Sequence, residues 1–81
     1  METTAPHIFI RLAREADNPS LLRLAALDSA PAPHGPVLVA DLGGEIVAAH
    51  YAHHSRTIAD PFRPTADLGA LLELRAGQLS L

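Results

Sequence analysis

Three histidines near the middle of the chain are the residues whose chemistry is easiest to name. They are His50, His53 and His54, and a neutral imidazole is the commonest metal ligand. On an extended strand His50 and His54 would share a face about 13 Å apart, and His53 would point to the opposite face. Zinc holds its nitrogen ligands at about 2.0–2.1 Å, so a regular strand would keep the three rings from one ion. We therefore predict solvated histidines at a strand end, with a metal site kept as a weak possibility.

A histidine general base is a second possibility, because the ordinary pKa of imidazole, about 6.5, suits proton transfer near neutral pH. The sequence offers such a base no partner. It contains no Gly-x-Ser-x-Gly turn, its serines fall in cap, loop or terminal contexts, and its nine carboxylates are scattered. His7 and His34 are isolated, and we expect both at the surface. We predict no catalytic residue.

The densest group of charges lies in the last third of the chain, where Arg56, Asp60, Arg63 and Asp67 alternate in sign. Arg56 and Arg63 are the weak cofactor-binding candidates, for a contact with an anion or a peptide. Alternating signs favour a different interpretation, an ion-pair network that orders the proline-containing loop. Phe62 lies inside that loop, and we expect it to fill the core or a partner's surface.

The composition excludes several classes of protein. The chain has 81 residues, six of them basic and nine acidic, for a net charge of −3. It offers no basic stripe for nucleic acid. The absence of cysteine fits a reducing compartment, so we expect a cytoplasmic protein. Residues 1–6 are unlike a signal peptide, and no apolar run reaches the roughly 18 residues of a membrane span. We expect a single domain, 1–81, with a flexible start at 1–6.

Hydrophobic periodicity predicts an α/β chain of the α+β type, with a mostly antiparallel four-stranded sheet and two helices in the order β-α-β-β-β-α. The expected strands span 7–13, 36–42, 45–53 and 56–60. The first helix should span 19–28 with Asn18 as its cap. The second should follow Thr65 and place one stripe on the sheet, made of Leu68, Leu71, Leu72, Ala76 and Leu79.

The pair Gly43-Gly44 predicts a tight hairpin, because both turn positions need a positive φ. A two-residue loop then fixes the register. The expected partners are Asp41 with Ile46, Val39 with Ala48, Val37 with His50 and Leu38 with Ala49.

This order of elements resembles the N-terminal half of the GCN5-related N-acetyltransferase (GNAT) fold. Ile10-Arg11-Leu12-Ala13 and Asp17 look like the family's opening strand and the acidic residue before its first helix. The segments 37–41 and 43–49 are similar to its second hairpin. The resemblance implies a scaffold over about residues 8 to 79 and an acyl-CoA cofactor.

The chain departs from this family where the cofactor should bind. The family's acyl-CoA pyrophosphate lies on amides of a glycine-rich turn before a helix, where the helix dipole also favours an anion. The matching segment here, 60–67, has no glycine and contains two prolines, each lacking an amide donor. The family's further strands, with their tyrosine acid, have no counterpart in these 81 residues. The resemblance therefore implies the family's scaffold without its binding turn for the acyl-CoA pyrophosphate.

Such a half-fold leaves the fourth strand at a sheet edge and apolar surface uncovered, and both favour pairing with another chain. We expect a homodimer or another protein partner, with Tyr51 half-buried at the interface. The favoured function is a non-catalytic, self-associating interaction module without a cofactor. Two alternatives stay open: an acetyl-CoA-dependent N-acyltransferase completed by a second chain, and a metal or small-ligand binder that uses the histidines.

Overall fold

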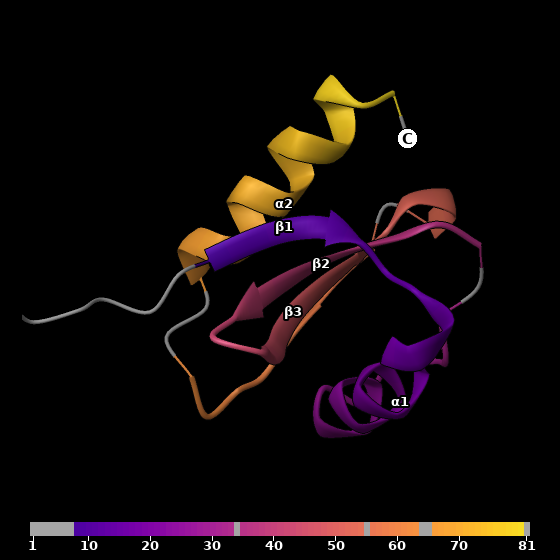
Figure 1. The fold of residues 1–81 in the computed structure, drawn as a ribbon. Helices are drawn as coiled ribbons and strands as arrows, with labels where there is room; N and C mark the ends of the chain where they lie inside the picture. The colour runs from indigo at the N-terminus through magenta and orange to yellow at the C-terminus, as the bar shows by residue number, and fades with distance from the viewer. Residues whose placement is uncertain (1–7, 34, 55, 64–65, 81) are drawn as a thin grey trace, which may run out of the picture.

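The computed structural model describes residues 8–33, 35–54, 56–63 and 66–80, with only the backbone at 54 and 66. Four strands form one antiparallel sheet in the order β1-β2-β3-β4. The sheet lies between two helices, α1 on one face and α2 on the other (Figure 1). This confirms the predicted four-stranded antiparallel sheet with two helices. The elements are β1 (Ile8–Leu12), the 3-10 turn η1 (Glu15–Asp17), α1 (Asn18–Leu27), β2 (Val37–Leu42), β3 (Glu45–Tyr51), the 3-10 turn η2 (Ala52–His54), β4 (Arg56–Ala59) and α2 (Ala66–Gln78).

Each face of the sheet has its own apolar core because β2 and β3 bury side chains on both sides, as expected of covered strands. The core under α1 contains Leu21, Leu24, Ala25, Val37, Val39, Ile46, Ala49, Tyr51 and Ile58. The core under α2 contains Leu38, Ala40, Val47, Ala48, Leu68, Leu72 and Ala76.

A bulge in β3 corrects the predicted hairpin register. Asp41 faces Ile46 as expected, but the register then shifts and Ala40 faces Ala48. Val47 therefore has no partner on β2, and it lies with Ala48 in the core under α2. The bulge turns two consecutive side chains to one face. Beyond it the predicted pairing is wrong by one residue, and His50 faces Leu38 instead of Val37.

Both helices also differ from the prediction at particular residues. Asn18 is the first residue of α1 and not its cap, because η1 precedes it. The predicted stripe of the second helix is too broad: Leu71 on α2 remains 43% exposed, and Leu79, just beyond the end of α2, is 49% exposed. The expected cap at Thr65 lies outside the described residues.

The termini of the predicted strands shift less. β1 and β4 end close to their expected positions, whereas β3 stops at Tyr51 and the chain turns through η2. No helix in the described part of the chain combines the length and the apolar character needed to cross a membrane. The expected flexible residues 1–6 and the expected surface residues His7 and His34 lie outside the described residues.

Candidate functional site

The three histidines of the predicted cluster do not lie on one strand. His50 is in β3, whereas His53 and His54 belong to η2, the 3-10 turn that follows β3. His50 is buried and His53 is exposed. The side chain of His54 lies outside the described residues. Among the side chains that the structure describes, no group of three or more His, Cys, Asp or Glu residues is placed to hold a metal ion.

His50 belongs instead to a short polar chain that joins β3, β4 and α2. Its Nδ1 lies 2.9 Å from Oγ1 of Thr57, the residue opposite it on β4. Thr57 donates its hydroxyl proton to Oε2 of Glu73 at 3.2 Å. Since a hydroxyl has one proton, Thr57 must accept a hydrogen bond from the Nδ1–H of His50. The threonine oxygen therefore gives no proton to the imidazole, as an activated nucleophile would.

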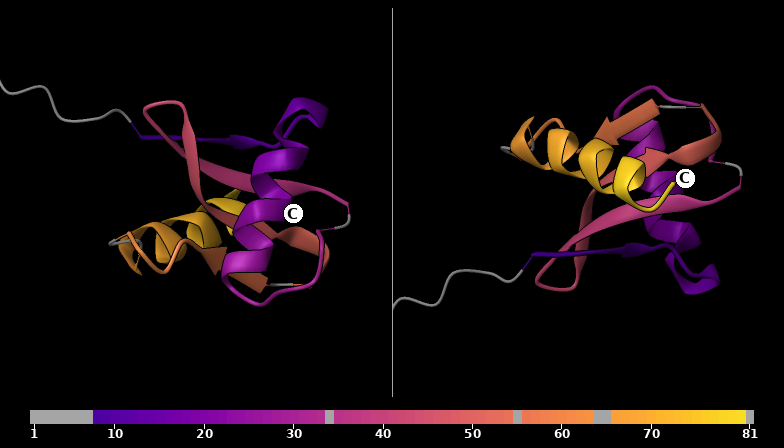
Figure 2. Two further views of the ribbon diagram at one scale, coloured as in Figure 1. Left: turned by 90° about the horizontal axis from the view of Figure 1, so that it is seen from below. Right: turned by 90° about the horizontal axis from the view of Figure 1, so that it is seen from above.

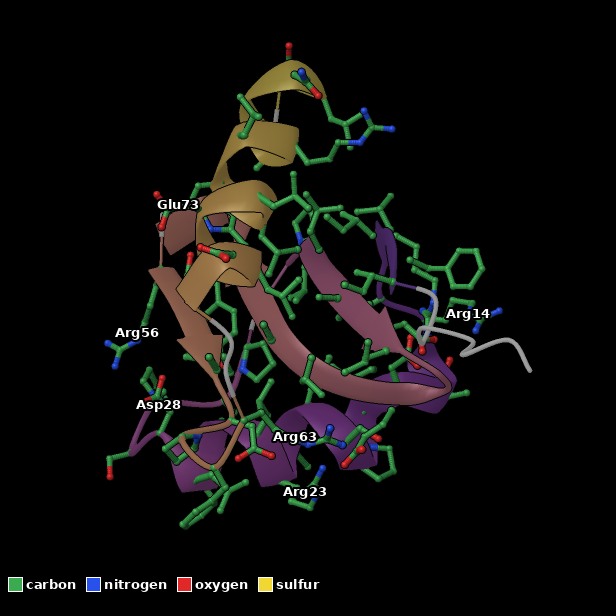
Figure 3. The ribbon with its side chains drawn as sticks, turned by 90° about the vertical axis from the view of Figure 1, so that its left-hand side faces the viewer. Arg14, Arg23, Asp28, Arg56, Arg63 and Glu73 are labelled. Atoms are coloured by element: carbon green, nitrogen blue, oxygen red, sulfur yellow. The ribbon has the colours of Figure 1, made fainter. Side chains whose placement is uncertain are left out.

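The two candidate anion-binding arginines lie at opposite ends of β3. Arg56 faces Tyr51, the last residue of β3, and Arg63 forms an ion pair with Glu45, the first residue. Seven residues of extended chain separate these ends by about 20 Å. Figure 3 shows Arg56 projecting from the outer edge of the sheet, well apart from Arg63. The structure therefore does not bring these two cations together.

Glu45 replaces Asp60 and Asp67 as the partner of Arg63. Its carboxylate also lies 3.7 Å from the guanidinium of Arg23 on α1. Glu45 therefore links the hairpin both to α1 and to the loop after β4. Its two partners, Arg23 and Arg63, are labelled in Figure 3. Arg56 forms no ion pair with any residue that the structure describes, so the predicted network of four alternating charges is not the arrangement found.

The loop between β4 and α2 is held by Asp60. The buried carboxylate of Asp60 accepts the N–H of Phe62 at 2.8 Å, and its carbonyl accepts the N–H of Arg63 at 3.2 Å. Pro61 and Pro64 have no N–H to offer. No main-chain donor between residues 61 and 64 is therefore left for a bound anion.

A second polar cluster fixes the start of α1 relative to the sheet. Arg11 on β1 donates to both carboxylate oxygens of Asp17, at 2.7 and 3.1 Å, and to Asp41 at 3.2 Å. Asp17 also accepts the N–H of Arg14 at 2.7 Å. The hydrogen bond from Arg11, followed by that from Arg14, lowers the pKa of Asp17 from 3.8 to about 2. Asp41 accepts the N–H of Gly44, so it also stabilises the hairpin turn.

A cleft of about 380 Å³ lies beside this cluster, where β1 leads into α1. Its polar lining includes Arg14, Glu15 and Asn18, and its apolar lining includes Leu21 and Val37. His50, His53, Arg56 and Arg63 are not among the described residues that line it. The predicted site residues therefore converge neither on one another nor on this cleft.

Comparison with known proteins gives no match. No family model, no curated protein and no solved structure is similar to this chain. The likeness to the N-acetyltransferase scaffold is therefore a proposal.

The predictions for two aromatic residues are wrong in part. Tyr51 is 1% exposed in the core under α1, not half-buried at a surface, and its hydroxyl donates to the carbonyl of Pro31 at 3.0 Å. Burial raises the pKa of this hydroxyl. Phe62 is 81% exposed, so it does not fill the core. Only a surface role is left for Phe62.

The sequence predicted uncovered apolar surface, but it did not predict which large apolar side chains are exposed. The large ones are Ile8, Phe9, Leu12, Leu22, Phe62, Leu71, Leu74 and Leu79. The period-2 pattern identified β1 as a strand, but its position at the edge of the sheet depends on which strands pair. Exposed apolar groups that lie close together are typical of surfaces that bind other proteins.

Proposed function

We propose that this chain is a non-catalytic interaction module that associates with itself, built on a scaffold like the N-terminal half of the GNAT fold. The observation that carries this function is the use of the loop amides. Phe62 and Arg63 donate their N–H groups to Asp60, and the neighbouring prolines have none. A glycine-rich phosphate-binding turn works through free amides at this position, and this loop leaves none between 61 and 64.

The charges around the loop also disfavour a bound anion. Asp60 is buried in the loop, and Asp67 lies in the first turn of α2, where an acidic side chain competes with an anion for the positive end of the helix dipole. Arg63, the nearest cation in sequence, is paired with Glu45. The local field therefore disfavours a pyrophosphate.

The exposed apolar residues favour binding of a protein. β1 and β4 are both edge strands, and half-exposed Ile8 and Leu12 lie on β1. An open sheet edge offers main-chain donors and acceptors to another strand. Together these features support association over chemistry as the task of this domain.

Calorimetric titration with acetyl-CoA tests the module against the enzyme. We expect no saturable heat from the purified chain with acetyl-CoA up to about 1 mM, a concentration at which binding weaker than about −4.1 kcal/mol is not resolved. Saturable binding in the micromolar range would overturn the proposed function and favour an acyltransferase completed by a second chain.

The double variant Arg56→Ala, Arg63→Ala is the matched control for that titration. If acetyl-CoA binds the wild-type chain and the variant loses affinity, these arginines form the anion site despite their separation. Circular dichroism of the variant checks that loss of the Arg63–Glu45 ion pair has not unfolded the domain. Mass measured by light scattering on the same samples reports self-association independently of cofactor binding.

A further inference from the structure

The outer edge of β4 is partly closed by a side chain. In an antiparallel pair, alternate residues turn their main-chain groups toward the neighbouring strand. The N–H of Asp60 donates to the carbonyl of Val47 on β3. The main-chain N–H and C=O groups of Thr57 and Ala59 therefore point away from β3. The N–H of Ala59 donates to the carboxylate of Asp28, from the end of α1, at 3.2 Å. A carboxylate on the edge and charged Arg56 beside it discourage pairing with another strand.

The outer edge of β1 has a different character. Ala13 donates to Val37 on β2 at 2.8 Å, so Ile8, Ile10 and Leu12 turn their main-chain groups away from the sheet. The carbonyl of Leu12 accepts a long 3.4 Å hydrogen bond from its neighbour Arg11, which leaves one lone pair. Within the described residues no hydrogen bond reaches the outward groups of Ile8 and Ile10.

The side chains of this edge are apolar and lie beyond the helix. Ile10 packs against the core under α2, so Ile8 and Leu12, at period 2 from it, lie on the same face. They are 47% and 51% exposed. Figure 2 shows α2 over the β3 and β4 side of the sheet, with β1 well away from it. The edge therefore combines open main-chain groups with an uncovered apolar strip.

We propose that this edge binds the β1 edge of a second copy of the chain, antiparallel about a two-fold axis at Ile10, to form one continuous eight-stranded sheet from two four-stranded ones. This dimer rests on the self-association proposed above and assigns its site. A two-fold interface uses the same patch on both copies. Pairing through the axis at Ile10 places Ile8 opposite Leu12 of the partner, and Phe9 opposite Arg11.

The register follows from which groups point outward. Ile8, Ile10 and Leu12 all carry outward groups, so the pairs 8–12, 10–10 and 12–8 each form two main-chain hydrogen bonds. On the other face this register places Arg11 opposite Phe9, so no two like charges face each other. An axis at Arg11 would oppose two like charges, and an axis at Phe9 would pair three of the five β1 residues. The axis at Ile10 alone pairs the full strand.

The size of the contact sets the expected affinity. A strand of five residues with half-exposed side chains buries less than the roughly 800 Å² per partner of a standard interface. We therefore expect a reversible dimer with a dissociation constant of tens to hundreds of micromolar, which forms as the protein concentration is raised. Sedimentation equilibrium of the full chain from about 10 µM to 1 mM covers this range.

Two charge variants test the partners within the register. Ile8→Lys and Leu12→Glu replace exposed side chains, so both variants should fold, which circular dichroism verifies. Each alone opposes a charge to an apolar residue in both halves of the dimer, and we expect at least a tenfold rise in dissociation constant. In an equimolar mixture, Lys from one chain faces Glu from the other at one pair, and the second pair is the native Leu12 with Ile8. We expect the mixture to restore dimers of mixed composition.

Leu22→Lys is the matched control, because Leu22 is 55% exposed on α1. It should leave the dissociation constant unchanged, and equal loss of association in this variant would overturn a specific β1 contact. A single-chain mass for the wild type at every concentration overturns both the dimer and the self-association of the proposed function. If dimers survive both β1 variants, the assignment of the contact to β1 is overturned, and the self-association itself is not. Variants that dissociate but do not recover on mixing overturn the register.

Discussion

Replacing Asp17 with asparagine should remove a specific, pH-dependent part of the stability of this domain. Asp17 is 8% exposed and receives both arms of the Arg11 guanidinium, together with the N–H of Arg14. These donors hold the pKa of its carboxyl at about 2, below the ordinary 3.8. The contribution to the free energy of unfolding is present above pH 3.8 and disappears as the pH falls through about 2.

The magnitude follows from the same pKa. The difference between 3.8 and about 2, at about 1.36 kcal/mol per pH unit, gives an upper limit of about 2.4 kcal/mol. The side chain of Arg11 is 26% exposed, so solvent screens part of this attraction. We therefore expect Asp17→Asn to lower the free energy of unfolding by about 1–2 kcal/mol at pH 7.

Urea denaturation followed by far-ultraviolet circular dichroism measures this loss, at one protein concentration so that association does not change the comparison. Titrations at several pH values from 7 to about 2 should show the wild-type and variant curves converging toward the acid end. Glu15→Gln, an exposed carboxyl in the same turn, should have little effect. A constant difference between Asp17→Asn and the wild type at pH 7 and pH 2 would refute the electrostatic explanation.

Two further substitutions test other contacts by the same denaturation assay. Thr57→Val removes the acceptor of buried His50 and should lower the free energy of unfolding by about 1–3 kcal/mol. Glu73→Gln keeps an acceptor for Thr57 and should lower it by less. Equal losses of stability in the two variants would contradict this order. Gly35→Ala should destabilise the fold, because its φ is +71° and a Cβ there would lie 2.6 Å from Nδ1 of His53. Adding His53→Ala should recover the steric part of the loss and leave a backbone penalty of about 1 kcal/mol; full recovery would show that the positive φ is unstrained.

Sequence patterns were most accurate where one local interaction decides the structure. The Gly43-Gly44 pair adopts positive φ at both positions and places Asp41 opposite Ile46, as predicted. The register beyond it depends on the bulge at Val47, and there the prediction failed. The carbonyl of Val47 accepts from Asp60 beyond the end of β4, a contact that joins residues distant in the sequence. Local periodicity cannot predict such a bulge.

The candidate site was predicted less well because charges near one another in sequence need not meet in space. Arg63 pairs with Glu45 across the fold, and Arg56 lies at the other end of β3. His50 forms a hydrogen bond with Thr57 on β4, and Thr57 forms a second one with Glu73 on α2. No spacing rule links these three elements, because the sheet register and the position of α2 bring them together.

The sequence by itself determined the order of the elements, the antiparallel hairpin and the absence of amide donors at the two prolines, because each depends on residues close together along the chain. Only the tertiary structure decided which apolar side chains remain exposed. Leu71 and Leu72 are adjacent on α2, yet Leu72 is fully buried and Leu71 is 43% exposed, because burial depends on which direction faces the sheet. In the same way, strand order alone leaves Ile8 and Leu12 at an open edge, where a second strand can pair with them.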